Sequence, residues 1–178
     1  MNIRSYFYNC SEDYINKINP QLFAEVTDVL HSLEKRNTQS EINMDILIEL
    51  SKRGWSFDSA PASLQHLKDS NTRFLCLTST TLNARWHSDF AKLFDNRLVQ
   101  VEIQFGTVES MFKDFCGFRI AYYERRLDLG IEVVMCEPNA YFAERKSSVT
   151  GMAYFDIAKN TLPSIGLDCP IWLLGLYE

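Results

Sequence analysis

Apolar residues recur at helical spacing in the first part of the chain. Between residues 19 and 36 they form one continuous stripe, made up of Leu22, Phe23, Val26, Val29, Leu30 and Leu33. Asn19 can cap such a helix, and Pro20 suits its first position. The pattern therefore predicts an amphipathic helix over 19–36. The same reasoning predicts a helix over 40–53 capped by Ser40, and another over 107–124.

After residue 85 the spacing changes to alternation. Two alternating runs, 85–94 and 97–105, flank Asp95-Asn96, a pair that tolerates the left-handed backbone of a tight turn, so a β-hairpin is predicted. Two continuous apolar runs, 129–135 and 171–176, are typical of buried central strands. Strands mixed with helices indicate an α/β or α+β fold, and one domain over 1–178 is expected from the length.

The predicted hairpin has one apolar face and one ionisable face. A two-residue loop places Asp89 opposite Glu102 and His87 opposite Gln104 on the ionisable face. The other face carries Phe90, Phe94, Val99, Val101, Ile103 and Phe105. The apolar face suits the core, which leaves the ionisable face for chemistry or for solvent.

Two opposed carboxylates need something to offset their repulsion, which is roughly 4 kcal/mol at about 4 Å and an effective dielectric constant of about 20. Mg²⁺ does so directly, because it takes one or two carboxylates and keeps several waters. The carbonyl of Ile103 is a further possible ligand beside Asp89 and Glu102. The alternative is a solvated charged face on which Arg85 or a neighbouring Lys screens Asp89.

Composition limits the ligands, the metal sites and the cellular location that we expect. A net charge of −5 does not favour a nucleic-acid binder, although basic pairs occur at Arg125-Arg126 and Arg145-Lys146. The five cysteines are scattered and never form C-x-x-C, which argues against a disulfide framework and against zinc. The sequence has neither a leader nor an apolar run near 18 residues, so a cytoplasmic protein without membrane contact is expected.

Three motifs in chain order resemble type II restriction endonucleases of the BglII/BstYI family: residues 88–92 (SDFAK), 101–106 (VEIQFG) and 127–132 (LDLGIE). This family is a variant of the PD-(D/E)xK nucleases in which Gln replaces the usual final Lys. The resemblance implies a restriction-endonuclease-like core with a mixed central sheet flanked by helices. It also implies an enzyme that uses Mg²⁺ and no organic cofactor.

Carried over to this chain, the resemblance makes Asp89 and Glu102 metal ligands and Gln104 a catalytic residue. Asp95 is a rival ligand, but it sits at the tip of the hairpin. A neutral amide can neither accept a proton at pH 7 nor supply charge, so Gln104 is expected to orient a metal-bound water. His87 either assists from the next position or is idle.

Relatives contribute another acidic or amide residue from an upstream helix, for which Asp69 and Asn71 are the candidates. Two further carboxylates, Asp128 and Glu132, are interpreted as partners of Arg125, Arg126 or Arg119 rather than as catalytic groups.

DNA contacts are expected from a polar loop near the C-terminal third and from one position after the Gln104 motif. The expected residues are Arg145, Lys146, Ser147, Ser148, Thr150 and Thr107. Relatives often place a basic residue where this chain has Thr107, so contacts there are expected to differ. The alternative is that this loop is an exposed polar segment without a role in DNA binding.

The resemblance implies a homodimer that hydrolyses double-stranded DNA at a short palindromic site, with a GATC core suggested by relatives and 5′-phosphate ends. The helices over 19–36, 40–53 and 107–124 offer dimer surfaces or are buried within the monomer. Two alternatives stay open: a non-specific repair or phage nuclease of the same fold, and a DNA-binding protein with a degenerate site.

Overall fold

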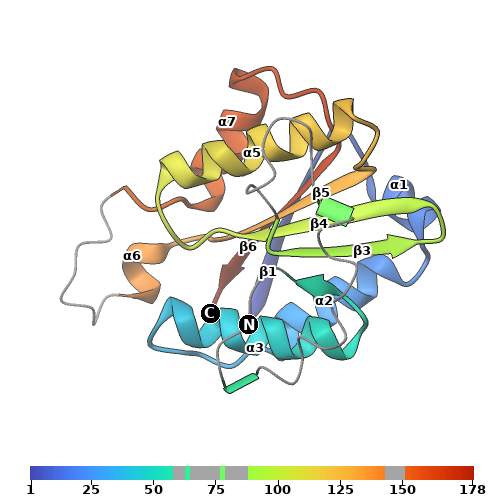
Figure 1. Ribbon diagram of the computed structural model, residues 1–178. Helices are drawn as coiled ribbons and strands as arrows, with labels where there is room; N and C mark the ends of the chain where they lie inside the picture. The colour runs from blue at the N-terminus through green and yellow to red at the C-terminus, as the bar shows by residue number, and fades with distance from the viewer. Residues whose placement is uncertain (58–62, 65–76, 79–87, 143–150) are drawn as a thin grey trace.

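A six-stranded mixed sheet lies at the centre of the protein (Figure 1). The structure is a computed structural model that describes residues 1–57, 63–64, 77–78, 88–142 and 151–178. Its strands are β1 (Asn2–Tyr8), β2 (Ser56–Phe57), β3 (Phe90–Phe94), β4 (Arg97–Ile103), β5 (Leu129–Met135) and β6 (Ile171–Tyr177). The order is β1-β6-β5-β4-β3-β2, with parallel pairing only at β4–β5 and β5–β6. The expected mixed sheet flanked by helices is confirmed.

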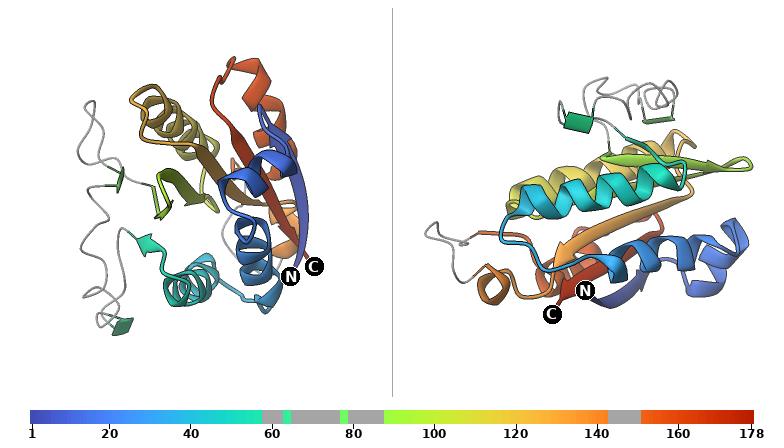
Figure 2. Two further views of the ribbon diagram at one scale, coloured as in Figure 1. Left: turned by 90° about the vertical axis from the view of Figure 1, so that its right-hand side faces the viewer. Right: turned by 90° about the horizontal axis from the view of Figure 1, so that it is seen from below.

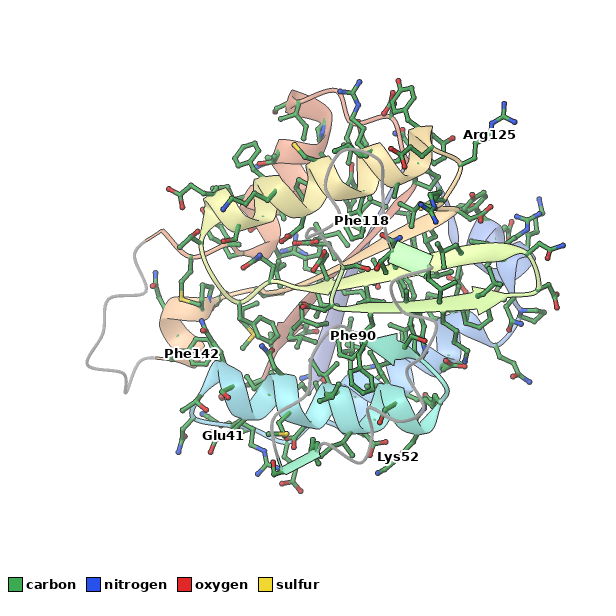
Figure 3. The ribbon with its side chains drawn as sticks, viewed as in Figure 1. Glu41, Lys52, Phe90, Phe118, Arg125 and Phe142 are labelled. Atoms are coloured by element: carbon green, nitrogen blue, oxygen red, sulfur yellow. The ribbon has the colours of Figure 1, made fainter. Side chains whose placement is uncertain are left out.

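Helices cover both faces of this sheet. They are α1 (Glu12–Ile18), α2 (Leu22–Ser32), α3 (Gln39–Lys52), α5 (Val108–Tyr123), α6 (Pro138–Tyr141) and α7 (Phe155–Ser164). In Figure 1, α5 and α7 lie above the sheet and α2 and α3 below it, and Figure 2 gives two further views. The larger core cluster joins α1, α2 and α3 to one face, and a second joins α5 and α7 to the other. Phe90 points toward α3, whereas Phe118 lies between α5 and the sheet (Figure 3). No helix in the described part is long and apolar enough to span a membrane.

The two hairpin strands pair as predicted. Phe94 faces Arg97 across the turn and Phe90 faces Val101, while Asp95 takes the left-handed conformation with φ of 54°. The described strands are shorter than the predicted runs, and residues 85–87 lie outside the described part. The continuous runs 129–135 and 171–176 form β5 and β6, and every residue of β5 is buried.

The predicted helix over 19–36 is wrong at both ends. Asn19 does not begin it but ends α1, with extended backbone. Its side-chain oxygen accepts from the Gln21 amide at 2.8 Å, and the chain turns there before α2 starts. The helix then stops at Ser32, because Leu33 has ψ of 131°.

The second helix begins slightly earlier than predicted. Thr38, not Ser40, caps α3, and it forms a capping box in which Thr38 and Glu41 satisfy each other's backbone amides. Gly54 follows the helix with φ of +78°, as expected for a glycine stop. The apolar stripes of α2 and α3 are buried within this chain.

Candidate functional site

Asp89 and Glu102 lie opposite each other at the open end of the hairpin. Asp89 directly precedes β3, and the register places it across from Glu102, one position beyond the Phe90–Val101 pair. The Asp89 amide donates to Glu102 Oε2 at 3.3 Å, and the Ile103 amide donates to Asp89 Oδ2 at 2.8 Å. The predicted juxtaposition of the two carboxylates is therefore present, and backbone amides orient both.

A third acid stands beside Glu102 on the neighbouring strand. In the parallel β4–β5 ladder Glu102 pairs with Glu132, and adjacent strands are roughly 4.8 Å apart. Glu132 is 0% exposed and Glu102 is 8% exposed. Neither carboxylate oxygen of Glu132 has a hydrogen-bond partner in the described part of the chain. Two acids thus share the buried face that α5 covers.

Gln104 is held in place from two sides. Its Nε2 donates to Asp114 Oδ2 at 2.5 Å, and its Oε1 accepts from the Gly106 amide at 2.8 Å. A Cβ atom at position 106 would come within 2.7 Å of Gln104 Oε1, so a side chain there would displace the amide. The glycine of the Q-F-G motif is therefore explained by the close approach of the Gln104 amide.

Burial and mutual repulsion raise the pKa values of these acids. The pKa of Glu102 is held well above 4.5, first by desolvation and then by the charges of Asp89, Asp114 and Glu132. Desolvation also raises the pKa of Glu132 well above 4.5, with Asp114 and Asp89 adding to it. Burial raises the pKa of Asp114 from 3.8 to about 6, although the hydrogen bond from Gln104 opposes the shift. Each carboxylate is thus costly to ionise without a cation nearby.

The donor set fits a hard divalent cation. Asp89, Glu102 and the Ile103 carbonyl are all oxygen donors, the type that Mg²⁺ prefers. Within the described ranges, no three His, Cys, Asp or Glu side chains already converge as a complete metal cage. A cation that uses one or two carboxylates and keeps its waters does not require such a cage.

A cavity of about 380 Å³ opens beside Asp89 and Ile103. It lies between the end of the hairpin and α3, and its remaining lining residues are Gln39, Ser40, Asn43, Met44, Leu47 and Phe90. The first turns of α3 thus present hydroxyl and amide groups next to the candidate ligands. Among the described residues, the cavity adjoins Asp89 on the α3 side.

The interpretation of Glu132 as a partner of an arginine is wrong, whereas the pairing of Asp128 with an arginine stays a prediction. Arg119 pairs with Asp168 at 3.2 Å, and Arg125 points away beyond the end of α5 (Figure 3). Asp128 accepts the Leu98 amide at 2.7 Å, so it ties β5 to the turn end of β4. Glu132 is buried among the acids of the site, where no arginine of the described residues pairs with it.

Several expected residues lie outside the described part of the chain. These are His87, Asp69, Asn71, Arg145, Lys146, Ser147, Ser148 and Thr150. Thr107 is described: its hydroxyl accepts the Ser110 amide at 3.3 Å and caps α5. Its predicted DNA contact stays a prediction.

Asp114 is the residue that the sequence interpretation missed. It occupies the buried stripe of α5 together with Met111, Phe115 and Phe118. A single acid among apolar residues at i, i+3, i+4 and i+7 spacing is the signal that marks it, because unpaired carboxylates are rarely buried.

Comparisons with known proteins identify the family and agree with the fold. The family model described as "Restriction endonuclease BglII/BglIII" matches residues 3–176. Among solved structures, the crystal structure of restriction endonuclease BglII complexed with a DNA 16-mer matches with a TM-score of 0.67 and 20% sequence identity. That match covers 100% of this chain and 79% of the other. No curated protein sequence matches the chain.

Proposed function

Because this chain belongs to the restriction endonuclease BglII/BglIII family, we propose that it hydrolyses double-stranded DNA with Mg²⁺ held by Asp89, Glu102 and the Ile103 carbonyl. Family membership makes it a type II site-specific deoxyribonuclease.

One observation carries the proposal: buried acids gather around Glu102, and burial and their mutual charge raise its pKa. At roughly 5 Å and an effective dielectric constant of about 20, each carboxylate pair repels by about 3 kcal/mol. A divalent cation offsets such repulsion, and restriction endonucleases generally use a divalent metal. Mg²⁺ bound at this point would lower the pKa of a water and neutralise charge on the phosphate.

Gln104 has the role of orienting the nucleophilic water. Its amide carries no charge, and Asp114 and the Gly106 amide fix both of its ends. An amide oxygen has two lone pairs and an amide nitrogen has two hydrogens, so each end keeps one free hydrogen-bonding position. Gln104 can therefore position a water without taking up its proton.

DNA contacts are proposed on the side where the Gln104 motif ends. Gly151 and Ala153, which follow the predicted contact loop at 145–150, are tied to this motif by backbone bonds. The Val108 amide donates to the Gly151 carbonyl at 2.9 Å, and the Ala153 amide donates to the Gly106 carbonyl at 2.8 Å. This attachment supports a role for the loop and for Thr107 next to the catalytic residues.

We propose that the protein acts as a homodimer on a short palindrome, for which a GATC core is the first candidate, and leaves 5′-phosphate ends. A two-fold dimer matches a palindromic site, with each active site cutting one strand. Digestion of a plasmid in Mg²⁺ should give discrete fragments, and run-off sequencing of them reports site, symmetry and stagger together. A smear of products would contradict a fixed site.

The ligand assignment has its own test. Glu102→Ala should abolish cleavage yet still retard fragments that carry the mapped site in Ca²⁺. Asp28→Ala, an exposed change on α2, should both cleave in Mg²⁺ and retard the same fragments in Ca²⁺ as the wild type does. A Glu102→Ala protein that cuts at the wild-type rate would contradict the assignment of Glu102 as a metal ligand.

A further inference from the structure

Glu132 has no structural role that the described residues explain. It is the only charged residue in β5, whose other members are Leu129, Gly130, Ile131, Val133, Val134 and Met135. A buried carboxylate without a hydrogen bond costs stability, and an apolar side chain would pack there without that cost. The position therefore weakens the fold of the cation-free protein.

The buried polar atoms without partners gather around Glu102. In the described ranges there are three such side-chain atoms: both oxygens of Glu132 and Nε2 of Gln100. Gln100 precedes Glu102 by two residues on the same face of β4, and Glu132 pairs with Glu102 on β5. A cavity of about 10 Å³ lies against Gln100 and Glu102 under α5, which is about the smallest volume that can hold one water. The buried polar atoms without hydrogen-bond partners thus lie near Glu102, the acid that would hold the cation.

Register places three acids in a row across adjacent strands. Asp89 stands opposite Glu102, and Glu102 pairs with Glu132. With strands roughly 4.8 Å apart, Glu132 lies on the side of Glu102 away from Asp89. A cation between Asp89 and Glu102 would therefore be attracted by the charge of Glu132, the next carboxylate beyond Glu102.

We propose that Glu132 is a positioning residue of the cation site, which completes a row of three acids and raises the affinity for a divalent cation held at Asp89 and Glu102. The inference rests on the proposed function. Residues that support metal ligands in this way typically change metal affinity by 10–100-fold when they are replaced. Glu132 acts through its negative charge, which adds to the charges of Asp89 and Glu102.

The test is a Mn²⁺ titration of the whole chain without DNA, with free Mn²⁺ followed by electron paramagnetic resonance. Glu132→Gln should weaken binding by about 10–100-fold, and Glu132→Asp, which keeps the charge, should retain most of the affinity. Asp128→Asn is the matched control, because it removes a carboxylate of the same segment that serves the fold. Its affinity should equal that of the wild type.

Thermal unfolding without a divalent cation distinguishes a loss of charge at the cation site from a loss of fold stability. Glu132→Gln should melt at or above the wild-type temperature, because it removes a buried unpartnered carboxyl. Glu132→Met repeats the titration with an apolar side chain of similar length, should the glutamine variant not fold. Equal Mn²⁺ affinity of the folded variants and a wild type that cuts DNA would overturn this inference alone. A wild type that binds no Mn²⁺ would overturn the metal assignment with it.

Discussion

The hairpin carries two clusters of largely buried charges on opposite faces, and among the described residues only one of them contains a neutralising cation. On the α2–α3 face, Lys92 Nζ lies 2.7 Å and 3.0 Å from the two carboxylate oxygens of Glu25. It also donates to the Arg53 carbonyl at 2.7 Å, and Trp55 Nε1 donates to Glu25 Oε1 at 2.5 Å. Every charge in this cluster has a partner within the fold.

The α5 face has the opposite composition. Glu102, Glu132 and Asp114 lie there with Gln104, and no lysine or arginine of the described residues pairs with them. Desolvation is the largest cause of the raised pKa of each acid. We infer that the cluster completed internally fixes the hairpin, whereas the incomplete one is the cluster that, under the proposed function, would bind an external cation.

The largest expected effect comes from Glu102→Gln, which should move activity and stability in opposite directions. Cleavage of a mapped site in Mg²⁺ should fall by about a thousandfold, some 4 kcal/mol of transition-state stabilisation. The cation-free protein should become more resistant to urea, because one buried carboxyl is removed from a repelling group. Loss of both activity and stability would make Glu102 an ordinary structural residue.

Lys92→Met should do the reverse and destabilise the fold. It leaves the Glu25 carboxylate largely buried without its cation, which typically costs about 3–5 kcal/mol. Urea unfolding measures the loss, and the double variant Glu25→Gln/Lys92→Met should recover much of it because no lone charge remains. Cleavage per folded molecule should stay near the wild-type value. A single variant as stable as the wild type would show that the Lys92 cluster does not fix the hairpin.

The pKa of Asp114 predicts a pH dependence of the cation-free protein. Burial raises this pKa from 3.8 to about 6, so between these values the folded protein binds more protons than the unfolded chain. Stability should therefore fall as the pH rises through this window, by at most about 3 kcal/mol from this group. Asp114→Asn should flatten the profile of urea unfolding measured at pH 4.5 and pH 7 without divalent cations. Parallel profiles for the variant and the wild type would contradict the assignment.

The hairpin was predictable because its information is local. Alternating residues and the Asp95-Asn96 turn fix which side chains face each other, so the pairing of Asp89 with Glu102 followed from counting. The apolar runs of β5 and β6 were equally clear, because both faces of these central strands are covered. The helix starts at Asn19 and Ser40 failed, since nearby polar residues compete for the same capping role.

The rest of the site depends on contacts between segments that are distant in sequence. The place of Glu132 beside Glu102 comes from the parallel pairing of β4 with β5, across the whole of α5. Local sequence instead offered nearby arginines as partners, which was wrong. Asp114 joins the site only because α5 packs over these strands, and helical spacing alone does not say what lies opposite a buried position.

The smallest expected effect tests the arginine interpretation directly. Arg119 lies on the outer side of α5 in an exposed pair with Asp168, and exposed ion pairs contribute little to stability. Arg119→Gln should therefore leave the melting temperature and the Mn²⁺ affinity unchanged, whereas Glu132→Gln lowers the affinity. If Arg119 neutralised Glu132, its removal would free a negative charge and alter cation binding. A change in Mn²⁺ affinity in Arg119→Gln would therefore mean that the α5 face has an internal cation after all, and the contrast between the two faces of the hairpin would be lost.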